Sequence, residues 1–130
     1  MKYMVLMNAN AASLGAFGAM QPEDIQAHIR FMHDVNVELK KSGEFVMAEG
    51  LTFPNEARVV QARAKGEKPM VTDGPFAETK EYLMGFWILD VKSPERIVEI
   101  AAHISGAPGA GGVPMNFPVE IRPVGQAPEV

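Results

Sequence analysis

The hydrophobic positions along the chain follow two periods, which separate predicted strands from predicted helices. Apolar residues fill both alternating sets in residues 2–7 and again in residues 83–91, as in strands that are covered on both faces. In residues 22–43 they recur instead at spacings of three and four, which predicts a helix with one apolar stripe facing a sheet. Residues 93–105 begin with serine and proline, a typical helix start, and carry a second such stripe.

Shorter segments complete the order of elements. Residues 44–51 and 119–122 are predicted strands, and residues 57–64 and 68–72 are predicted to be the two arms of a hairpin. The full order is strand, helix, strand, hairpin, strand, helix, strand, which is the split βαβ arrangement with one insertion. We therefore expect an α+β, ferredoxin-like domain whose antiparallel sheet is covered by two helices on one face.

The remaining stretches are rich in glycine, alanine and proline and show no period. Residues 8–20 and 106–118 are predicted to be flexible loops, and residues 124–130 a loose tail. Because 130 residues fall within the usual size of one domain, we expect residues 1–130 to form a single domain.

Two strands that are apolar on both faces predict a partner molecule. Helices on one face of the sheet leave the other apolar face in water unless something covers it. A second copy pressing sheet against sheet is the simplest cover, and about 800 Å² per partner would make such an interface stable. We expect a homodimer formed through the sheet face.

Composition limits the classes of function. The formal charge of −4 and the lack of a basic run disfavour nucleic-acid binding. The chain has no cysteine, which excludes a disulfide, a thiolate metal site and a cysteine nucleophile. No apolar run reaches the roughly 20 residues of a membrane span, and no secretion signal is recognisable, so we expect a cytoplasmic protein that does not bind membranes.

The sequence favours neither a metal nor a cofactor. Its three histidines are dispersed, and the five-residue gap between His28 and His33 spreads them around the helix, so no bound metal is predicted. Gly109, Gly111 and Gly112 follow a predicted helix instead of opening one after a strand, so neither a phosphate loop nor a dinucleotide fingerprint is present.

His28 is the first candidate for catalysis. It lies in the apolar stripe of the first predicted helix, where a neutral imidazole could face a cavity and exchange a proton. The alternative is a core histidine bonded to a backbone carbonyl. His33 lies off the stripe beside Asp34, and we expect it to be exposed unless residues 8–20 fold over it and make it a ligand contact.

Charged residues concentrate just before the strand of residues 83–91. Asp73, Glu78 and Lys80 belong to this group, and opposite charges paired in a cleft shift one another's pKa, as acid–base groups require. We therefore take Asp73 as a second catalytic candidate and Glu78 and Lys80 as ligand contacts. The alternative is a solvated turn, because Asp, Gly and Pro in succession favour one.

Arg122 is a further candidate ligand contact. It lies in the last predicted strand, which would stand beside the Asp73 turn, and a buried arginine binds carboxylates in bidentate fashion.

The most distinctive stretch is residues 71–81, Val-Thr-Asp-Gly-Pro-Phe-Ala-Glu-Thr-Lys-Glu. Together with Gly-Phe-Trp-Ile-Leu at 85–89, Glu-Gly-Leu at 49–51 and Val-Glu-Ile-Arg-Pro-Val at 119–124, it resembles the DGPF-domain branch of the YCII-related family. The resemblance spans essentially the whole chain and implies a dimeric α+β barrel.

The resemblance also implies two kinds of role. Some YCII relatives are similar to small dehalogenating or lactone-processing enzymes in which a His and an Asp matter, and others are encoded beside extracytoplasmic-function sigma factors. This chain departs from the His/Asp pattern, because Ser42-Gly43 supplies no carboxylate at the helix end.

Three functional hypotheses follow. The first is a small-molecule binder or an unassigned, cofactor-free acid–base enzyme, with a pocket between the first helix and the sheet and polar contacts from His28, Asp73, Glu78 and Arg122. The second is an accessory or regulatory protein of a sigma-factor system without catalysis, and the third is a dimer with neither activity. A closed, polar-lined cavity would favour the first hypothesis, and an exposed apolar patch over a filled core the second.

Overall fold

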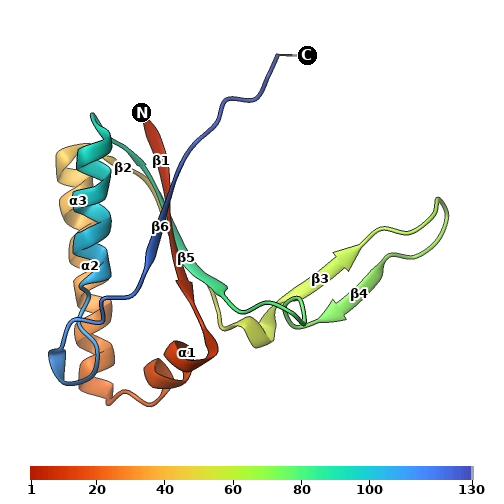
Figure 1. Cartoon of the computed structure of the whole chain (residues 1–130), viewed down its shortest axis with the longest axis horizontal. Coiled ribbons are helices and arrows are strands. Elements are labelled where there is room, and N and C mark those ends of the chain that lie inside the picture. The colour runs from red at the N-terminus through yellow and green to blue at the C-terminus, as the bar shows by residue number, and fades with distance from the viewer. Residues whose placement is uncertain (130) are drawn as a thin grey trace.

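The computed structural model describes residues 1–129, which form a four-stranded antiparallel sheet, a separate two-stranded hairpin and three α-helices (Figure 1). The first half contains β1 (Lys2–Ala9), α1 (Ala11–Gly18), α2 (Pro22–Ser42) and β2 (Phe45–Gly50). The hairpin β3 (Arg58–Gln61) and β4 (Met70–Asp73) is followed by β5 (Tyr82–Asp90), α3 (Pro94–Ser105) and β6 (Val119–Pro123). Single 3-10 turns, η1 (Pro54–Glu56) and η2 (Ala110–Gly112), lie in two connections. The predicted mixed α+β class is confirmed.

The strands of the main sheet lie in the order β2-β5-β1-β6, and all neighbours are antiparallel. The sheet thus combines two strand–helix–strand units, β1–α2–β2 and β5–α3–β6, and α2 and α3 lie together on one of its faces (Figure 1). Between these helices and the sheet lies the core, which is formed by Tyr3, Val5, Val35, Leu39, Trp87, Leu89, Val91, Ile97, Ile100 and Ile104.

Both long helices begin and end where the sequence predicts. Pro22 occupies the first turn of α2, and Gly43 ends the helix in the left-handed conformation at φ 79°, which glycine adopts without steric cost. At the start of α3, Ser93 accepts a hydrogen bond from the backbone N–H of Arg96 at 3.2 Å.

The prediction of a loop over residues 8–20 is wrong. β1 continues to Ala9, and residues 11–18 form α1. Asn10 accepts a hydrogen bond from the Ser13 N–H at 2.8 Å, while the Ser13 hydroxyl accepts one from the Asn10 N–H at 2.9 Å. This reciprocal cap and the strong helix propensity of alanine outweigh the two glycines of the segment.

The other two segments predicted to be irregular have little regular structure. Residues 106–118 contain no helix or strand beyond the turn η2 and an isolated bridge between Pro108 and Pro114. Residues 124–129 carry no regular structure, and residue 130 of the predicted tail lies outside the described residues.

The predicted hairpin is confirmed and projects away from the main sheet (Figure 1). β3 and β4 pair from Arg58 opposite Asp73 to Gln61 opposite Met70. Every residue from 60 to 73 is exposed, so the hairpin is an arm with little packing of its own. Two-stranded ribbons of this kind are marginally stable without further contacts.

The middle of the sheet face opposite α2 and α3 is also apolar, and Glu120 and Arg122 of β6 border it. Side chains alternate along β1 and β5, so Met4 and Leu6 point away from the helices, as do their partners Ile88 and Phe86. Met47 of β2 lies opposite Ile88 and is about half exposed. We call these five residues the open face, and no helix of the described chain covers them (Figure 1).

None of the helices formed by residues 1–129 combines the length and the apolar character that crossing a membrane requires.

Candidate functional site

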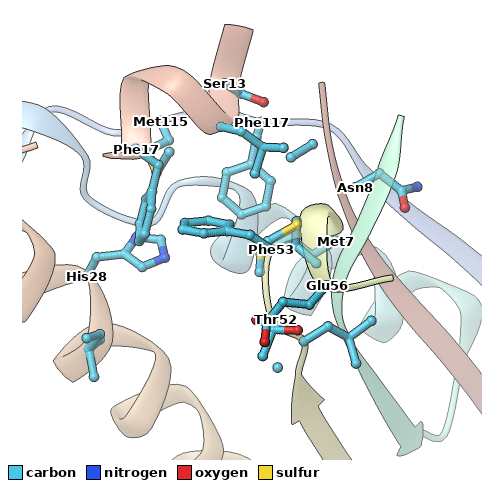
Figure 2. A pocket seen from close by; sticks show the side chains of 16 residues that line it. Met7, Asn8, Ser13, Phe17, His28, Thr52, Phe53, Glu56, Met115 and Phe117 are labelled. Atoms are coloured by element: carbon cyan, nitrogen blue, oxygen red, sulfur yellow. The ribbon is translucent and has the colours of Figure 1, made fainter. Parts of the chain in front are cut away.

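A pocket of about 550 Å³ lies between α1, the N-terminal half of α2, the segment after β2 and the chain before β6 (Figure 2). Apolar side chains make up most of its wall, among them Met7, Leu14, Phe17, Phe53, Met115 and Phe117. We call this cavity the His28 pocket, because His28 is its one buried polar side chain among the described residues.

His28 is held in a defined orientation. Its side chain comes from the inner face of α2, the residue is 8% exposed, and its Nδ1 lies 3.0 Å from the carbonyl oxygen of Pro108. A carbonyl oxygen can only accept, so Nδ1 carries the hydrogen of this bond. In the neutral ring Nε2 is then an unprotonated acceptor.

The free ring nitrogen of His28 is open to the pocket. Within residues 1–129, every side-chain nitrogen or oxygen that is fully buried has a hydrogen-bond partner, and Nε2 has none, so it retains accessible surface. Figure 2 shows the imidazole among the pocket-lining side chains beside Phe17. The bond from Nδ1 to Pro108 is the contact expected of a core histidine, while proton exchange through Nε2 stays a prediction.

Phe17 of α1 packs against the imidazole ring of His28. The two ring centroids lie 5.3 Å apart at an interplanar angle of 73°, an edge-to-face contact. The segment predicted to be a loop thus supplies an ordered aromatic wall, and the capping pair Asn10 and Ser13 is the local signal that could have revealed it.

Some of the remaining polar groups of the His28 pocket are already hydrogen-bonded within the chain. Ser13 is engaged in the α1 cap, and the Asn8 side chain donates to Glu120 at 3.4 Å. Thr52 and Glu56, from the segment that follows β2, contribute the other hydroxyl and a carboxylate. A ligand that contacts His28 therefore meets mainly apolar surface, with polar groups of the 52–56 segment as second contacts.

The Asp-Gly-Pro-Phe turn borders a neighbouring depression of about 430 Å³, which shares Leu51, Thr52, Phe53 and Glu56 with the His28 pocket. Gly74 has φ 86°, and its N–H donates to the carbonyl of Ala57 at 2.7 Å. The turn needs glycine at this position, because other residues adopt positive φ at a steric cost. The Asp-Gly-Pro-Phe turn therefore shapes the surface beside the His28 pocket.

Asp73 points to solvent. Its side chain is 93% exposed, and its carboxylate lies 3.8 Å from Nε of Arg58 across the hairpin. An ion pair at this distance and exposure contributes little to the stability of the fold, since water screens it. A single chain does not bring Asp73 to His28.

The other predicted ligand contacts also lie outside the lining of the His28 pocket. Glu78 and Lys80 are exposed in the turn before β5, and Arg122 is exposed on β6, opposite Met4 of β1. The hairpin arm extends away from β6 (Figure 1), so the expected neighbourhood of Arg122 and Asp73 is not formed within one chain. His33 is exposed on α2, 3.7 Å from the Asp34 carboxylate, and α1 does not cover it.

The ion pair of Arg96 and Glu44 lies away from the His28 pocket. Hydrogen bonds from Arg96 lower the pKa of Glu44 below its ordinary value, and the same pairing raises the pKa of Arg96.

In residues 1–129 no three His, Asp or Glu side chains gather closely enough to hold a metal ion.

Comparison with known sequences places the chain in a family. The model of the YCII-related domain matches residues 1–113, which include the His28 pocket except for Met115 and Phe117. An uncharacterized protein of Rhizobium meliloti (strain 1021), R00369, is 30% identical over 125 residues, which cover 95% of this chain and 92% of that protein. The chain belongs to the YCII-related family.

Proposed function

We propose that the protein binds a small, largely apolar molecule in the His28 pocket and that Nε2 of His28 is the main polar contact. The observation that carries the proposal is an imidazole whose Nδ1 is committed to Pro108 while Nε2 is open to an apolar cavity. The cavity volume of about 550 Å³ falls within the range of roughly 300–1,000 Å³ that is usual for small-molecule sites.

The chemistry that this arrangement supports is cofactor-free proton transfer. A neutral imidazole in a largely apolar pocket can take a proton from an acidic group of the ligand and return it to a neighbouring atom. Thr52 and Glu56 could orient the ligand from the wall formed by the segment after β2. Asp73 is proposed as a turn residue here, since one chain leaves it in solvent.

We also propose a branch of the family, a fold type and an oligomeric state for this protein. Residues 71–81 support membership of the DGPF branch, and the strand order β2-β5-β1-β6 with α2 and α3 on one face supports the ferredoxin-like type. The open face supports a homodimer of the α+β barrel kind, because a second copy would remove its apolar side chains from water.

A second candidate function uses the open face and not the pocket. An apolar sheet face with no covering helix in the described chain also fits a protein partner, as the regulatory role beside a sigma factor would require. That role would leave the occupancy of the His28 pocket without consequence, which separates it from the first proposal.

The test uses 2-naphthol, an uncharged aromatic alcohol whose fluorescence reports its environment. His28→Asn is the informative variant, because the asparagine amide can still donate to Pro108 while the Nε2 acceptor is lost. We expect the wild-type protein to bind 2-naphthol and His28→Asn to bind it about 3- to 10-fold more weakly, the loss expected for one hydrogen bond. Equal affinity in the two proteins, or no binding by either, would contradict the proposal.

A further inference from the structure

The Gly/Pro-rich segment of residues 107–115 is folded back on itself. The Gly109 N–H donates to the carbonyl of Val113 at 2.8 Å, and the Met115 N–H donates to that of Ala107 at 2.9 Å. Ala107 is fully buried, and a Cβ on Gly109 would meet Met115 Cγ at 2.8 Å. The segment is therefore a closely packed loop, which we call the clasp loop.

Two hydrogen bonds attach the clasp loop to α2. The Pro108 carbonyl accepts from His28 Nδ1, and the Gly111 N–H donates to the Asp24 carboxylate at 3.0 Å. Asp24 and His28 are four residues apart and therefore lie on the same side of the helix, one turn from each other. The loop is thus held at two points on one face, by a partly buried bond to His28 and by a more exposed bond to the Asp24 carboxylate.

This attachment determines which nitrogen of His28 carries the proton. With the hydrogen on Nε2, the lone pair of Nδ1 would face the lone pairs of the Pro108 oxygen at 3.0 Å, and both groups would lack a donor. The observed geometry therefore favours the tautomer with hydrogen on Nδ1. Met115, at the end of the clasp loop, also forms part of the pocket wall, so the loop sets both the tautomer and one wall.

We infer that the clasp loop, fastened by Asp24, is a positioning element that fixes His28 in the Nδ1–H tautomer, and that the pocket consequently selects apolar ligands presenting an O–H or N–H donor. The second half of this statement rests on the proposed function, while the first concerns the unliganded protein. Asp24 is a positioning residue, since it acts on His28 only through the loop.

The tautomer is measured by NMR of protein with nitrogen-15 in its histidine rings, because protonated and unprotonated ring nitrogens resonate far apart. The wild-type protein should show His28 protonated on Nδ1 alone at a pH where the ring is neutral. Asp24→Ala should raise the population protonated on Nε2. Asp24→Asn retains an oxygen that can accept from Gly111 and should preserve the wild-type spectrum.

Glu23→Ala is the matched control for the charge. Glu23 lies in the same first turn of α2 and is exposed, so its loss removes one acidic side chain without touching the clasp loop. A wild-type ring protonated on Nε2, or an Asp24→Ala spectrum identical to that of Glu23→Ala, would overturn the positioning role.

Ligand selection is tested with three probes that share one aromatic body: 2-naphthol, 2-methoxynaphthalene and 2-naphthoate. Only 2-naphthol presents a donor, and the wild type should bind it about 3- to 10-fold more tightly than 2-methoxynaphthalene. In Asp24→Ala this difference should shrink. Equal binding of 2-naphthol and 2-methoxynaphthalene, or preference for 2-naphthoate, would overturn donor selection. Should none of the probes bind, the proposed function fails, and the spectra of the unliganded protein still decide the role of the clasp loop.

Discussion

Arg96 of α3 holds Glu44, the residue just before β2, through two hydrogen bonds of 2.8 and 2.9 Å between the guanidinium and the two carboxylate oxygens. The Ser42 hydroxyl donates to the same carboxylate at 2.7 Å. The pair ties the connection between α2 and β2 in one strand–helix–strand unit to the helix of the other. Its Glu44 side chain is 14% exposed, so the pair is better shielded from water than the other ion pairs in residues 1–129.

This pair predicts a pH dependence of stability. Because the pKa of Glu44 is lowered in the folded state, the pair stabilises the protein above the ordinary pKa of 4.5, and that contribution is lost as the pH falls through the lowered value. Glu44→Gln should cost roughly 1 kcal/mol at neutral pH, since Arg96 is partly exposed and screened, and almost nothing in strong acid. Urea unfolding at both pH values checks this.

Glu99→Gln serves as the control for that experiment, because Glu99 contacts the same guanidinium at 3.2 Å from a more exposed position. We expect a smaller effect from it. A Glu44→Gln cost that is equally large in acid would contradict the ion-pair account.

Asn36 is predicted to be required for the packing of Trp87. The indole N–H of this buried tryptophan donates to the Asn36 side-chain oxygen at 2.8 Å. Asn36→Ala leaves the donor without its partner and should lower the free energy of unfolding by about 1–3 kcal/mol. Trp87 is the only tryptophan, so its fluorescence follows the unfolding directly. Asn36→Asp retains an acceptor for the indole N–H and should lose less stability than Asn36→Ala. An Asn36→Ala protein as stable as the wild type would refute the prediction.

The Asp-Gly-Pro-Phe turn is predicted to depend on its glycine more than on its aspartate. Gly74→Ala forces a side chain into positive φ and should cost about 1–2 kcal/mol. Asp73→Asn should change stability by less than about 0.5 kcal/mol and leave 2-naphthol affinity unchanged, because the Asp73 side chain is exposed. Thermal unfolding and probe titration measure both. Loss of 2-naphthol binding in Asp73→Asn would restore Asp73 as a site residue.

The homodimer proposal predicts the effect of a charge on the open face. Ile88 lies between Met4 and Met47 in the sheet, so Ile88→Lys should prevent association by placing an ammonium group in the interface. Sedimentation should show a dimer for the wild type and a folded monomer for the variant. Val98→Lys, on the exposed side of α3, is the control and should remain dimeric. A monomeric wild type at high concentration would contradict the proposal.

The sequence predicted the parts of the fold that depend on local periodicity. A spacing of three and four places apolar residues on one side of a helix, which then faces the core. The predicted stripes of α2 and α3 are accordingly buried at His28, Val35, Leu39, Ile97 and Ile104. α1 was missed because its glycine and alanine residues show no period, and the Asn10 and Ser13 cap was the one local signal of its start.

The site was predictable only in part, for a physical reason. His28 was found because it interrupts an apolar stripe, whereas its partner Pro108 lies eighty residues away and contacts it through the backbone, which no side-chain pattern records. Phe53 lines the pocket from an irregular segment, where packing depends on the tertiary fold. The charged residues Asp73 and Glu78 drew attention through the signature, yet both are exposed in one chain.

In the proposed function, Nε2 of His28 is the polar contact for a ligand in an apolar pocket. The most direct measurement is the nitrogen-15 spectrum of the His28 ring during a titration with 2-naphthol. We predict that the Nε2 resonance shifts in proportion to probe binding while Nδ1, held by Pro108, stays in place. Saturable binding of 2-naphthol that leaves the Nε2 resonance unchanged would contradict the claim.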